Sequence, residues 1–171
     1  MSVKSLLQNK KVLVVDDEKD VLEVLEDLLS MCKVSSASSF EEAKKLLETQ
    51  KFDIVVLDIM GVDGYALLQI AKRKGMPAVM LTGHAFNPPN LVKSIKGGAV
   101  SYIPKEEISR IQEFLNDVLV ALEKGEDPWI TWHERLPASF IDKRFTALWK
   151  DQDRDFWEGW KRGIFKELPK R

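Results

Sequence analysis

Five polar residues come at, or just after, the ends of short apolar runs in the sequence: Asp16, Asp17, Asp58, Thr82 and Lys105. A carboxylate can act as a nucleophile, and neighbouring carboxylates can hold a divalent cation. An ammonium group and a hydroxyl group can bind the oxygens of a phosphoryl group while it is transferred. Together these residue types supply the parts for moving a phosphoryl group onto a carboxylate.

The three carboxylates predict a metal ion. Carboxylates held close together repel one another, and loss of water adds to that cost. Mg²⁺ prefers oxygen ligands, keeps several waters, and typically uses one or two carboxylates plus a phosphoryl oxygen. We therefore expect Mg²⁺ beside Asp16, Asp17 and Asp58, with Lys105 as a second positive charge. Gly83, which follows Thr82, leaves room for an incoming group.

Each of these residues also has an ordinary explanation. An acidic pair before a helix is often an N-cap with favourable dipole charges, and a single Asp after a strand is often a turn residue. A single Thr or Lys at a strand end is only weak evidence for a functional site. The joint pattern favours a phosphoryl site, because four of the apolar runs each end in a residue type that one mechanism needs.

The apolar runs have the length and composition of β-strands, and helical periodicity lies between them. The strand candidates are residues 11–15, 52–57, 78–81 and 99–103, with a weaker, polar edge candidate at 34–37. Strands that alternate with helices indicate a parallel sheet covered on both faces. We expect an α/β fold, a flavodoxin-like doubly wound sheet of five parallel strands in the order 2-1-3-4-5. In that order the first and third strands are neighbours, so their carboxylates converge.

Local signals place several helix ends. Ser39 followed by Glu42 has capping-box spacing, which starts the second helix near Phe40. Pro89 suits the first turn of the fourth helix, and the pair Gly97-Gly98 ends it. Apolar residues from Ile108 to Leu122 predict one long fifth helix.

The composition changes after Gly125, since all five tryptophans lie beyond it. We therefore divide the chain into an N-terminal segment (1–9), an α/β domain that carries the phosphoryl site (10–124) and a C-terminal helical, Trp-rich extension (125–171). Asp127-Pro128 is typical of a turn, and residues 142–163 have a helical pattern. Three interpretations of the extension stay open: packing onto the domain, a homodimer or partner-docking surface, or an output activity of its own.

Composition narrows the function classes. Acidic and basic residues nearly cancel, at 27 against 26, and the extension has no evident basic recognition helix. No DNA-binding domain is therefore expected. No stretch approaches the roughly 18 apolar residues of a spanning helix, and the N-terminus lacks signal-peptide features. We expect a cytoplasmic protein.

Four stretches, VLVVDDE, IVVLDIMGVDG, VMLTGHA and GGAVSYIPKEE, resemble the receiver domains of bacterial two-component response regulators, the chemotaxis type included. The resemblance covers roughly residues 10–124. It implies a Mg²⁺-dependent phospho-acceptor at Asp58, phosphorylated by a sensor histidine kinase or a phosphotransfer protein, and a downstream protein target of unknown identity. Such a protein is not an enzyme on external substrates.

The resemblance also implies roles for single residues. Asp17, Asp58 and the backbone carbonyl of Met60 would bind the metal, with Asp16 acting through a water. Lys105 and Thr82 would contact the phosphoryl group.

Further positions follow from the same resemblance. Tyr102 would be a switch aromatic that turns inward as Thr82 moves, although core filling also explains it. His84 and Met60 would flank the acyl phosphate and tune its lifetime, although a solvated His is the commoner case. Pro104 precedes Lys105, whereas the family commonly has Pro after that lysine.

Two rival functions use the same fold. The first is a Mg²⁺-dependent phosphohydrolase with an Asp nucleophile. Enzymes of the haloacid-dehalogenase type have a second Asp two residues after the nucleophile, where this chain has Met60. The second rival is a phosphorylation-independent scaffold, against which the intact acidic set and Lys105 count.

Overall fold

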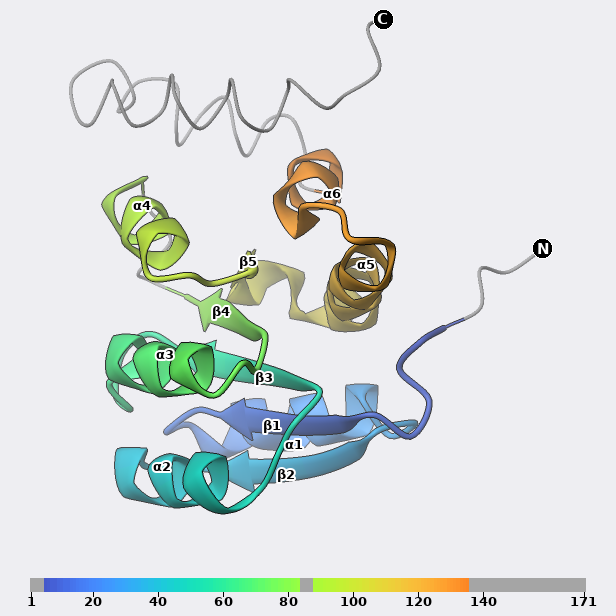
Figure 1. Cartoon of the computed structure of the whole chain (residues 1–171). Coiled ribbons are helices and arrows are strands. Elements are labelled where there is room, and N and C mark those ends of the chain that lie inside the picture. The colour runs from blue at the N-terminus through green and yellow to red at the C-terminus, as the bar shows by residue number, and fades with distance from the viewer. Residues whose placement is uncertain (1–4, 84–87, 136–171) are drawn as a thin grey trace, which may run out of the picture.

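The computed structural model describes residues 5–83 and 88–135. They form a five-stranded, all-parallel sheet in the order β2-β1-β3-β4-β5 (Figure 1). The strands are β1 Lys11–Val15, β2 Lys33–Ala37, β3 Ile54–Asp58, β4 Ala78–Thr82 and β5 Ser101–Pro104. The predicted flavodoxin-like order is confirmed, and no strand end differs from its predicted position by more than two residues.

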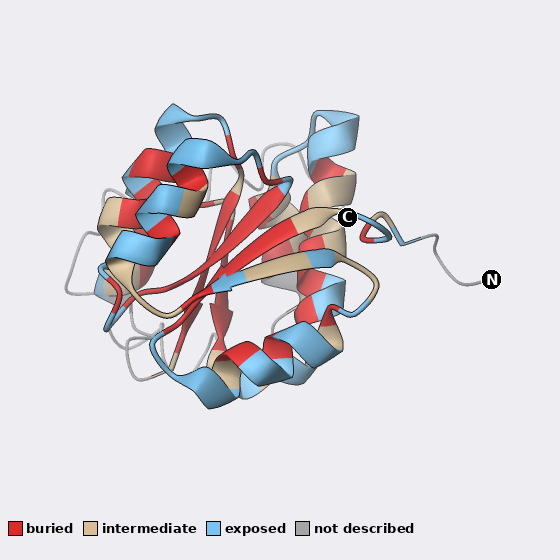
Figure 2. Cartoon of the chain, turned by 90° about the horizontal axis from the view of Figure 1, so that it is seen from below, coloured by how far each residue is buried: buried red, intermediate tan, exposed pale blue. Residues whose placement is uncertain are grey.

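Helices cover both faces of this sheet (Figure 2). In chain order they are α1 Lys19–Leu28, α2 Phe40–Thr49, α3 Gly64–Arg73, α4 Pro88–Lys96, the 3₁₀ helix η1 Lys105–Arg110, α5 Ile111–Lys124 and α6 Pro128–Arg135. Helices α2, α3 and α4 lie together on one side of the sheet, while α1 and α5 contact each other on the opposite side.

The burial of each strand follows its place in the sheet. Every residue of the central strands β3 and β4 is buried, which explains their unbroken apolar sequences. Strand β2 lies at an edge and carries the polar residues Ser35 and Ser36, both at least partly exposed, as its polar sequence predicted.

Predicted helix signals occur where expected, with one correction. Ser39 caps α2, and its hydroxyl accepts a hydrogen bond from the Glu42 amide at 3.2 Å. Helix α4 ends at Lys96, before the two glycines. The single long fifth helix is wrong, because Ile108 belongs to η1 and α5 begins only at Ile111. The backbone at Arg110, between η1 and α5, leaves the helical region and separates the two.

The predicted turn at Asp127-Pro128 is instead the start of α6. Pro128 takes the first helical position, where a missing N–H costs nothing, and the Asp127 carboxylate accepts a hydrogen bond from the Trp129 amide at 3.0 Å. Trp129 and Trp132 are buried in the main core. The helix predicted at 142–163 lies outside the described residues.

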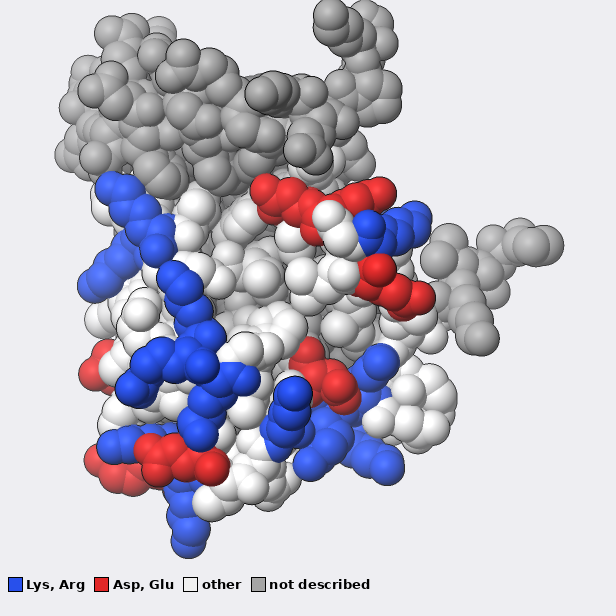
Figure 3. Space-filling model, viewed as in Figure 1, with Lys and Arg blue, Asp and Glu red and all other residues white. Residues whose placement is uncertain are grey.

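Charged side chains are unevenly distributed over the surface. Figure 3 shows lysine and arginine side chains gathered over α3 and α4. They include Lys72 and Arg73 in the last turn of α3, and Lys93 and Lys96 in the last turn of α4. Cations there face the negative ends of the helix dipoles, which accounts for the cluster without a ligand. None of the described helices is long and apolar enough to span a bilayer.

Candidate functional site

The predicted polar residues meet at the carboxyl ends of the strands, around a cleft of about 390 Å³. The cleft is lined by Asp17, Glu18, Asp58, Met60, Gly61, Thr82, Gly83 and Lys105. Asp16 lies beneath it and is fully buried. Side chains from four separate strand ends therefore share one small space, as the strand order predicts.

Lys105 occupies the centre of the site. Its Nζ atom lies 2.8 Å from Asp16 Oδ2 and 3.4 Å from both Asp58 Oδ1 and Glu18 Oε1. Pro104 holds an extended backbone at the end of β5, so Lys105 leaves the strand toward these carboxylates. Burial lowers the pKa of Lys105, but Asp16 and Asp58 outweigh it and leave that pKa above its ordinary value. The ammonium group is thus held in its charged form.

Asp16 is a buried carboxylate, and one of its two oxygens accepts a backbone hydrogen bond. Its Oδ1 accepts a hydrogen bond from the Glu18 amide at 2.9 Å, which also fixes the turn into α1. Within the described chain, its Oδ2 is the one buried side-chain oxygen or nitrogen that lacks a hydrogen bond, and its contact with Lys105 is an ion pair. Burial raises the pKa of Asp16 despite this contact. This oxygen can therefore accept a further cation or a bound water.

Asp58 ends β3 with a side chain only 7% exposed. Burial raises its pKa to about 7, with a further upward contribution from the charge of Asp16 and an opposing one from Lys105. The acceptor candidate is thus only partly ionised at neutral pH unless another positive charge joins the site. A divalent cation would supply that charge.

The loop between β3 and α3 brings the backbone close to the carboxylates. At Gly61, with φ +83°, a Cβ atom would lie 2.5 Å from the Asp17 Cγ atom. At Gly64 a Cβ atom would lie 2.0 Å from the backbone oxygen of Asp58. Only glycine fits at either place, and the loop is therefore built to pack directly against Asp17 and Asp58.

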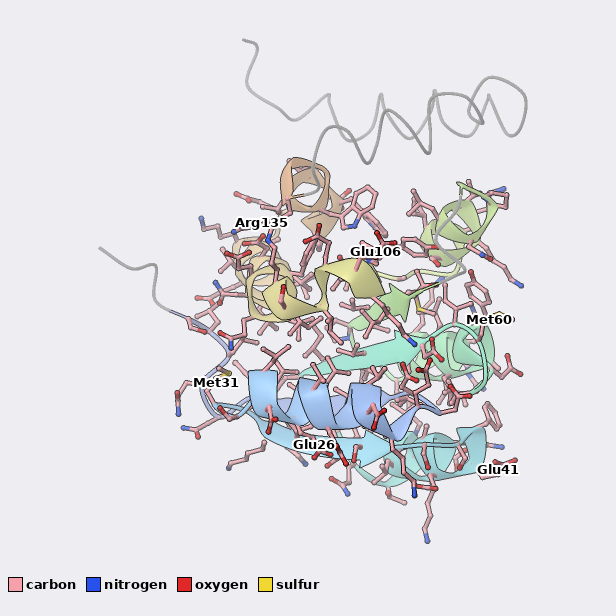
Figure 4. All side chains as sticks on the ribbon, turned by 180° about the vertical axis from the view of Figure 1, so that it is seen from behind. Glu26, Met31, Glu41, Met60, Glu106 and Arg135 are labelled. Carbon is pink, nitrogen blue, oxygen red and sulfur yellow. The ribbon has the colours of Figure 1, made fainter. Side chains whose placement is uncertain are left out.

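Thr82 and Tyr102 lie on neighbouring strands, and both are buried. Thr82 is in register with Pro104, and Tyr102 with Met80. Met60 is 66% exposed at the rim of the cleft (Figure 4). His84 lies outside the described residues, so its predicted tuning role stays a prediction.

The acidic residues fit a hard divalent cation. Carboxylate oxygens of Asp16, Asp17 and Glu18 can all lie within 4.8 Å of one another. The raised pKa of Asp58, which persists although Lys105 contacts it, indicates a site short of positive charge. Glu18 was missed by the sequence reasoning, although it directly extends the pair Asp16-Asp17 and its carboxylate contacts Lys105.

The chain matches a known protein family. The model of the response regulator receiver domain matches residues 12–116, well over half of the chain.

Curated relatives include transcriptional regulators. A probable transcriptional regulator ycf27 of Cyanidium caldarium is 34% identical over 124 residues, covering 65% of this chain and 49% of the relative. The alkaline phosphatase synthesis transcriptional regulatory protein PhoP of Bacillus subtilis is 36% identical over 129 residues, covering 69% and 53%. The chain spans about half the length of these relatives.

Solved structures are similar over the same region. A putative response regulator from Chloroflexus aurantiacus is 27% identical with a TM-score of 0.59, covering 66% of this chain and 98% of that one. A response regulator receiver domain protein from Clostridium thermocellum is 28% identical with a TM-score of 0.58, covering 67% and 97%. With the sheet order and the shared cleft, these matches settle the family: the chain belongs to the response regulator receiver domain family.

Proposed function

We propose that this protein is a two-component signalling switch that accepts a phosphoryl group on Asp58 in the presence of Mg²⁺. The observation that carries the proposal is the placement of Lys105 Nζ between Asp58 and Asp16 in one cleft of a receiver fold. The phosphodonor is a histidine kinase or a phosphotransfer protein, and the receiver domain comprises residues 10–124. We expect the protein to act in the cytoplasm.

In the proposed reaction an Asp58 carboxylate oxygen attacks the phosphorus atom of the donor. An O–P bond forms, the bond from phosphorus to the donor nitrogen or oxygen breaks, and the leaving group retains the electron pair. Lys105 binds an oxygen of the phosphoryl group and offsets the charge that it brings. The Thr82 hydroxyl donates a second hydrogen bond to that group. In a later step water attacks the phosphorus atom, the bond from phosphorus to the Asp58 oxygen breaks, inorganic phosphate leaves, and Asp58 is again a carboxylate.

Mg²⁺ would be held by Asp17, Asp58 and the Met60 carbonyl, with Asp16 acting through a water, and would supply positive charge to the acceptor and to the phosphoryl oxygens. The positive charge of the cation would also counteract the raised pKa of Asp58. A protonated carboxyl is a poor nucleophile, so any cation that lowers the pKa of Asp58 increases the reactive fraction at neutral pH.

The output is a change of binding surface. We assign the switch to Thr82 and Tyr102, which are buried on neighbouring strands. When the Thr82 hydroxyl moves to donate a hydrogen bond to the phosphoryl group, the packing of the Tyr102 ring changes. The names of the relatives connect them with transcription. For this chain we propose that the changed surface binds a protein target.

A phosphohydrolase is less well supported. The residue two positions after Asp58 is Met60, an exposed side chain that can neither donate nor accept a proton. No second acid or base is therefore supplied at the place where that class of enzyme has one.

The proposal is tested by incubating the protein with acetyl phosphate, with Mg²⁺ or with EDTA, and measuring intact mass. We expect one phosphoryl adduct with Mg²⁺, little with EDTA, and none in the Asp58→Ala variant. An adduct of undiminished yield in that variant, or none in the wild-type protein, would refute the assignment. Steady release of phosphate through many turnovers would favour the phosphohydrolase.

A further inference from the structure

Helix α6 lies against β5, the outer strand of the sheet next to α5 (Figure 1). The indole N–H of Trp129 donates to the Ala99 carbonyl at 3.1 Å, and the indole N–H of Trp132 donates to the Tyr102 carbonyl at 2.5 Å. The two rings meet edge to face at 5.1 Å, and the residues are 7% and 4% exposed. The extension therefore begins as a tryptophan pair packed over the sheet edge.

An edge strand presents backbone groups to any chain that can pair with it. Here two indole N–H groups bind carbonyls at or just before β5, and both hydrogen bonds are buried. A tryptophan N–H only donates, so its burial requires an acceptor at this position. The face beside β5 and α5 is thus occupied by the chain itself, and a second protein or a second copy would have to displace α6 to reach it.

The far end of α6 is attached to α5. The Arg135 guanidinium, labelled in Figure 4, binds the Asp117 carboxylate through two hydrogen bonds, of 2.6 and 3.1 Å. Arg110 Nη1 also donates to the Arg135 carbonyl at 3.2 Å. Asp117 belongs to α5 and Arg110 is the last residue of η1, so neither contact is on β5, and neither residue lines the acidic cleft. Helix α6 is therefore held at two separate places, only one of which is on the strand that leads to the cleft.

A short connection joins that place to the cleft. Tyr102, whose carbonyl binds Trp132, is three residues before Lys105, whose ammonium contacts Asp58 and Asp16. The intervening backbone is β5 itself, with Pro104 fixed in an extended conformation. Three extended residues span about 10 Å with little freedom to stretch. A displacement of Lys105 along this strand therefore reaches the Tyr102 carbonyl.

We propose that α6 is the partner of the receiver switch: a phosphoryl group at Asp58 changes the binding of Trp132 to β5, and the signal leaves through the chain's own C-terminal extension. This inference rests on the proposed phosphorylation of Asp58. The added charge redistributes the contacts of Lys105, which the unphosphorylated site divides among Asp16, Glu18 and Asp58. Tyr102 is a fully buried residue of β5 and its carbonyl accepts the Trp132 bond, so the strand cannot shift at this residue without altering that hydrogen bond.

The chain contains its own control. Trp129 makes an equivalent bond to Ala99, which precedes β5 and is three residues further from Lys105 than Tyr102 is. Coupling through β5 should act on Trp132 more strongly than on Trp129. A general destabilisation of the fold would instead weaken the indole hydrogen bonds of Trp129 and Trp132 to the same extent.

The test measures hydrogen exchange of the indole N–H groups by ¹H–¹⁵N NMR on the full chain, with acetyl phosphate in excess and Mg²⁺. Single Trp→Phe variants assign the resonances, and intact mass on the same sample reports the adduct. We expect the exchange rate of the Trp132 indole to change at least about fivefold, the lower end of usual allosteric couplings, and by more than that of Trp129. The Asp58→Asn variant should show no change.

Two failures are distinguishable. Absence of the mass adduct refutes the proposed function, whereas a full adduct with an unchanged Trp132 indole refutes the coupling alone. A second measurement uses reciprocity, because a coupling between two sites acts in both directions. Trp132→Phe keeps the aromatic packing but removes the donor, and it should change the equilibrium extent of phosphorylation or Mg²⁺ affinity more than Trp129→Phe does. Equal effects of the two variants would overturn the proposed route.

Discussion

The buried carboxylate of Asp58 should destabilise the metal-free protein at neutral pH, and Asp58→Asn should remove that cost. Burial raises the pKa of Asp58 from 3.8 to about 7. Each tenfold difference in acidity corresponds to about 1.36 kcal/mol, so the folded state loses at most ~4 kcal/mol above pH 7. This shift already includes the favourable contact of Asp58 with Lys105. The buried Asn amide also loses contact with water, which offsets part of the gain. We expect a net stabilisation of about 1–3 kcal/mol at pH 8.

The pH dependence follows from the sign of the change. A carboxyl whose pKa is higher in the folded than in the unfolded state binds more protons when folded. Its cost is absent below pH 3.8, grows through the interval up to about 7, and is constant above it. The stability difference between Asp58→Asn and the wild-type protein should therefore be small at pH 4 and largest at pH 8.

Urea unfolding in EDTA at several pH values measures this difference, and added Mg²⁺ provides the control. The cation should stabilise the wild-type protein at pH 8 by binding the folded state, and should stabilise Asp58→Asn less, since an amide offers no negative charge. A variant that is less stable than the wild-type protein at every pH would contradict the electrostatic reasoning. So would an equal stabilisation of both proteins by Mg²⁺.

Three further variants test separate parts of the site. Lys105→Met should lower the rate of adduct formation by roughly 10²-fold, the usual cost of losing one charged donor, while Mg²⁺ affinity is retained; an unchanged rate would contradict the role of Lys105. Gly61→Ala places a Cβ atom 2.5 Å from the Asp17 carboxylate at a positive φ, so it should lower stability by at least ~1 kcal/mol and weaken Mg²⁺ binding measured by calorimetry. An unchanged Mg²⁺ affinity in this variant would show that the loop moves to accommodate the methyl group, and would contradict the prediction. Ser39→Ala removes the cap of α2 and should cost about 1 kcal/mol in urea unfolding without changing adduct formation, as a structural control remote from the cleft.

Much of this site could be inferred from sequence because its residues are tied to strand ends. A parallel sheet brings the carboxyl ends of its strands to one edge, so Asp16, Asp58 and Lys105 needed only the strand order to be placed together. Glu18 was not inferred, because its contact with Lys105 depends on a side-chain direction at the start of α1 rather than on strand position.

The extension was harder to interpret. Its aromatic content predicted packing, but Asp127-Pro128 fits both a turn and a helix start, and only tertiary contact decides between them. Trp132 bonds to a backbone carbonyl thirty residues away, and no local pattern marks that acceptor. The break between η1 and α5 was missed for a related reason: the apolar spacing continues from Ile108 to Leu122 although the backbone at Arg110 does not remain helical.

The central claim concerns a covalent bond to one residue, and chemical trapping tests it most directly. Borohydride reduces an aspartyl phosphate to homoserine, so the phosphorylated side chain is identified by peptide mass spectrometry after treatment with acetyl phosphate, Mg²⁺ and borohydride. The account predicts homoserine at position 58, dependent on both the phosphodonor and Mg²⁺. Homoserine at another acidic residue, such as Asp17, or at none, would contradict it.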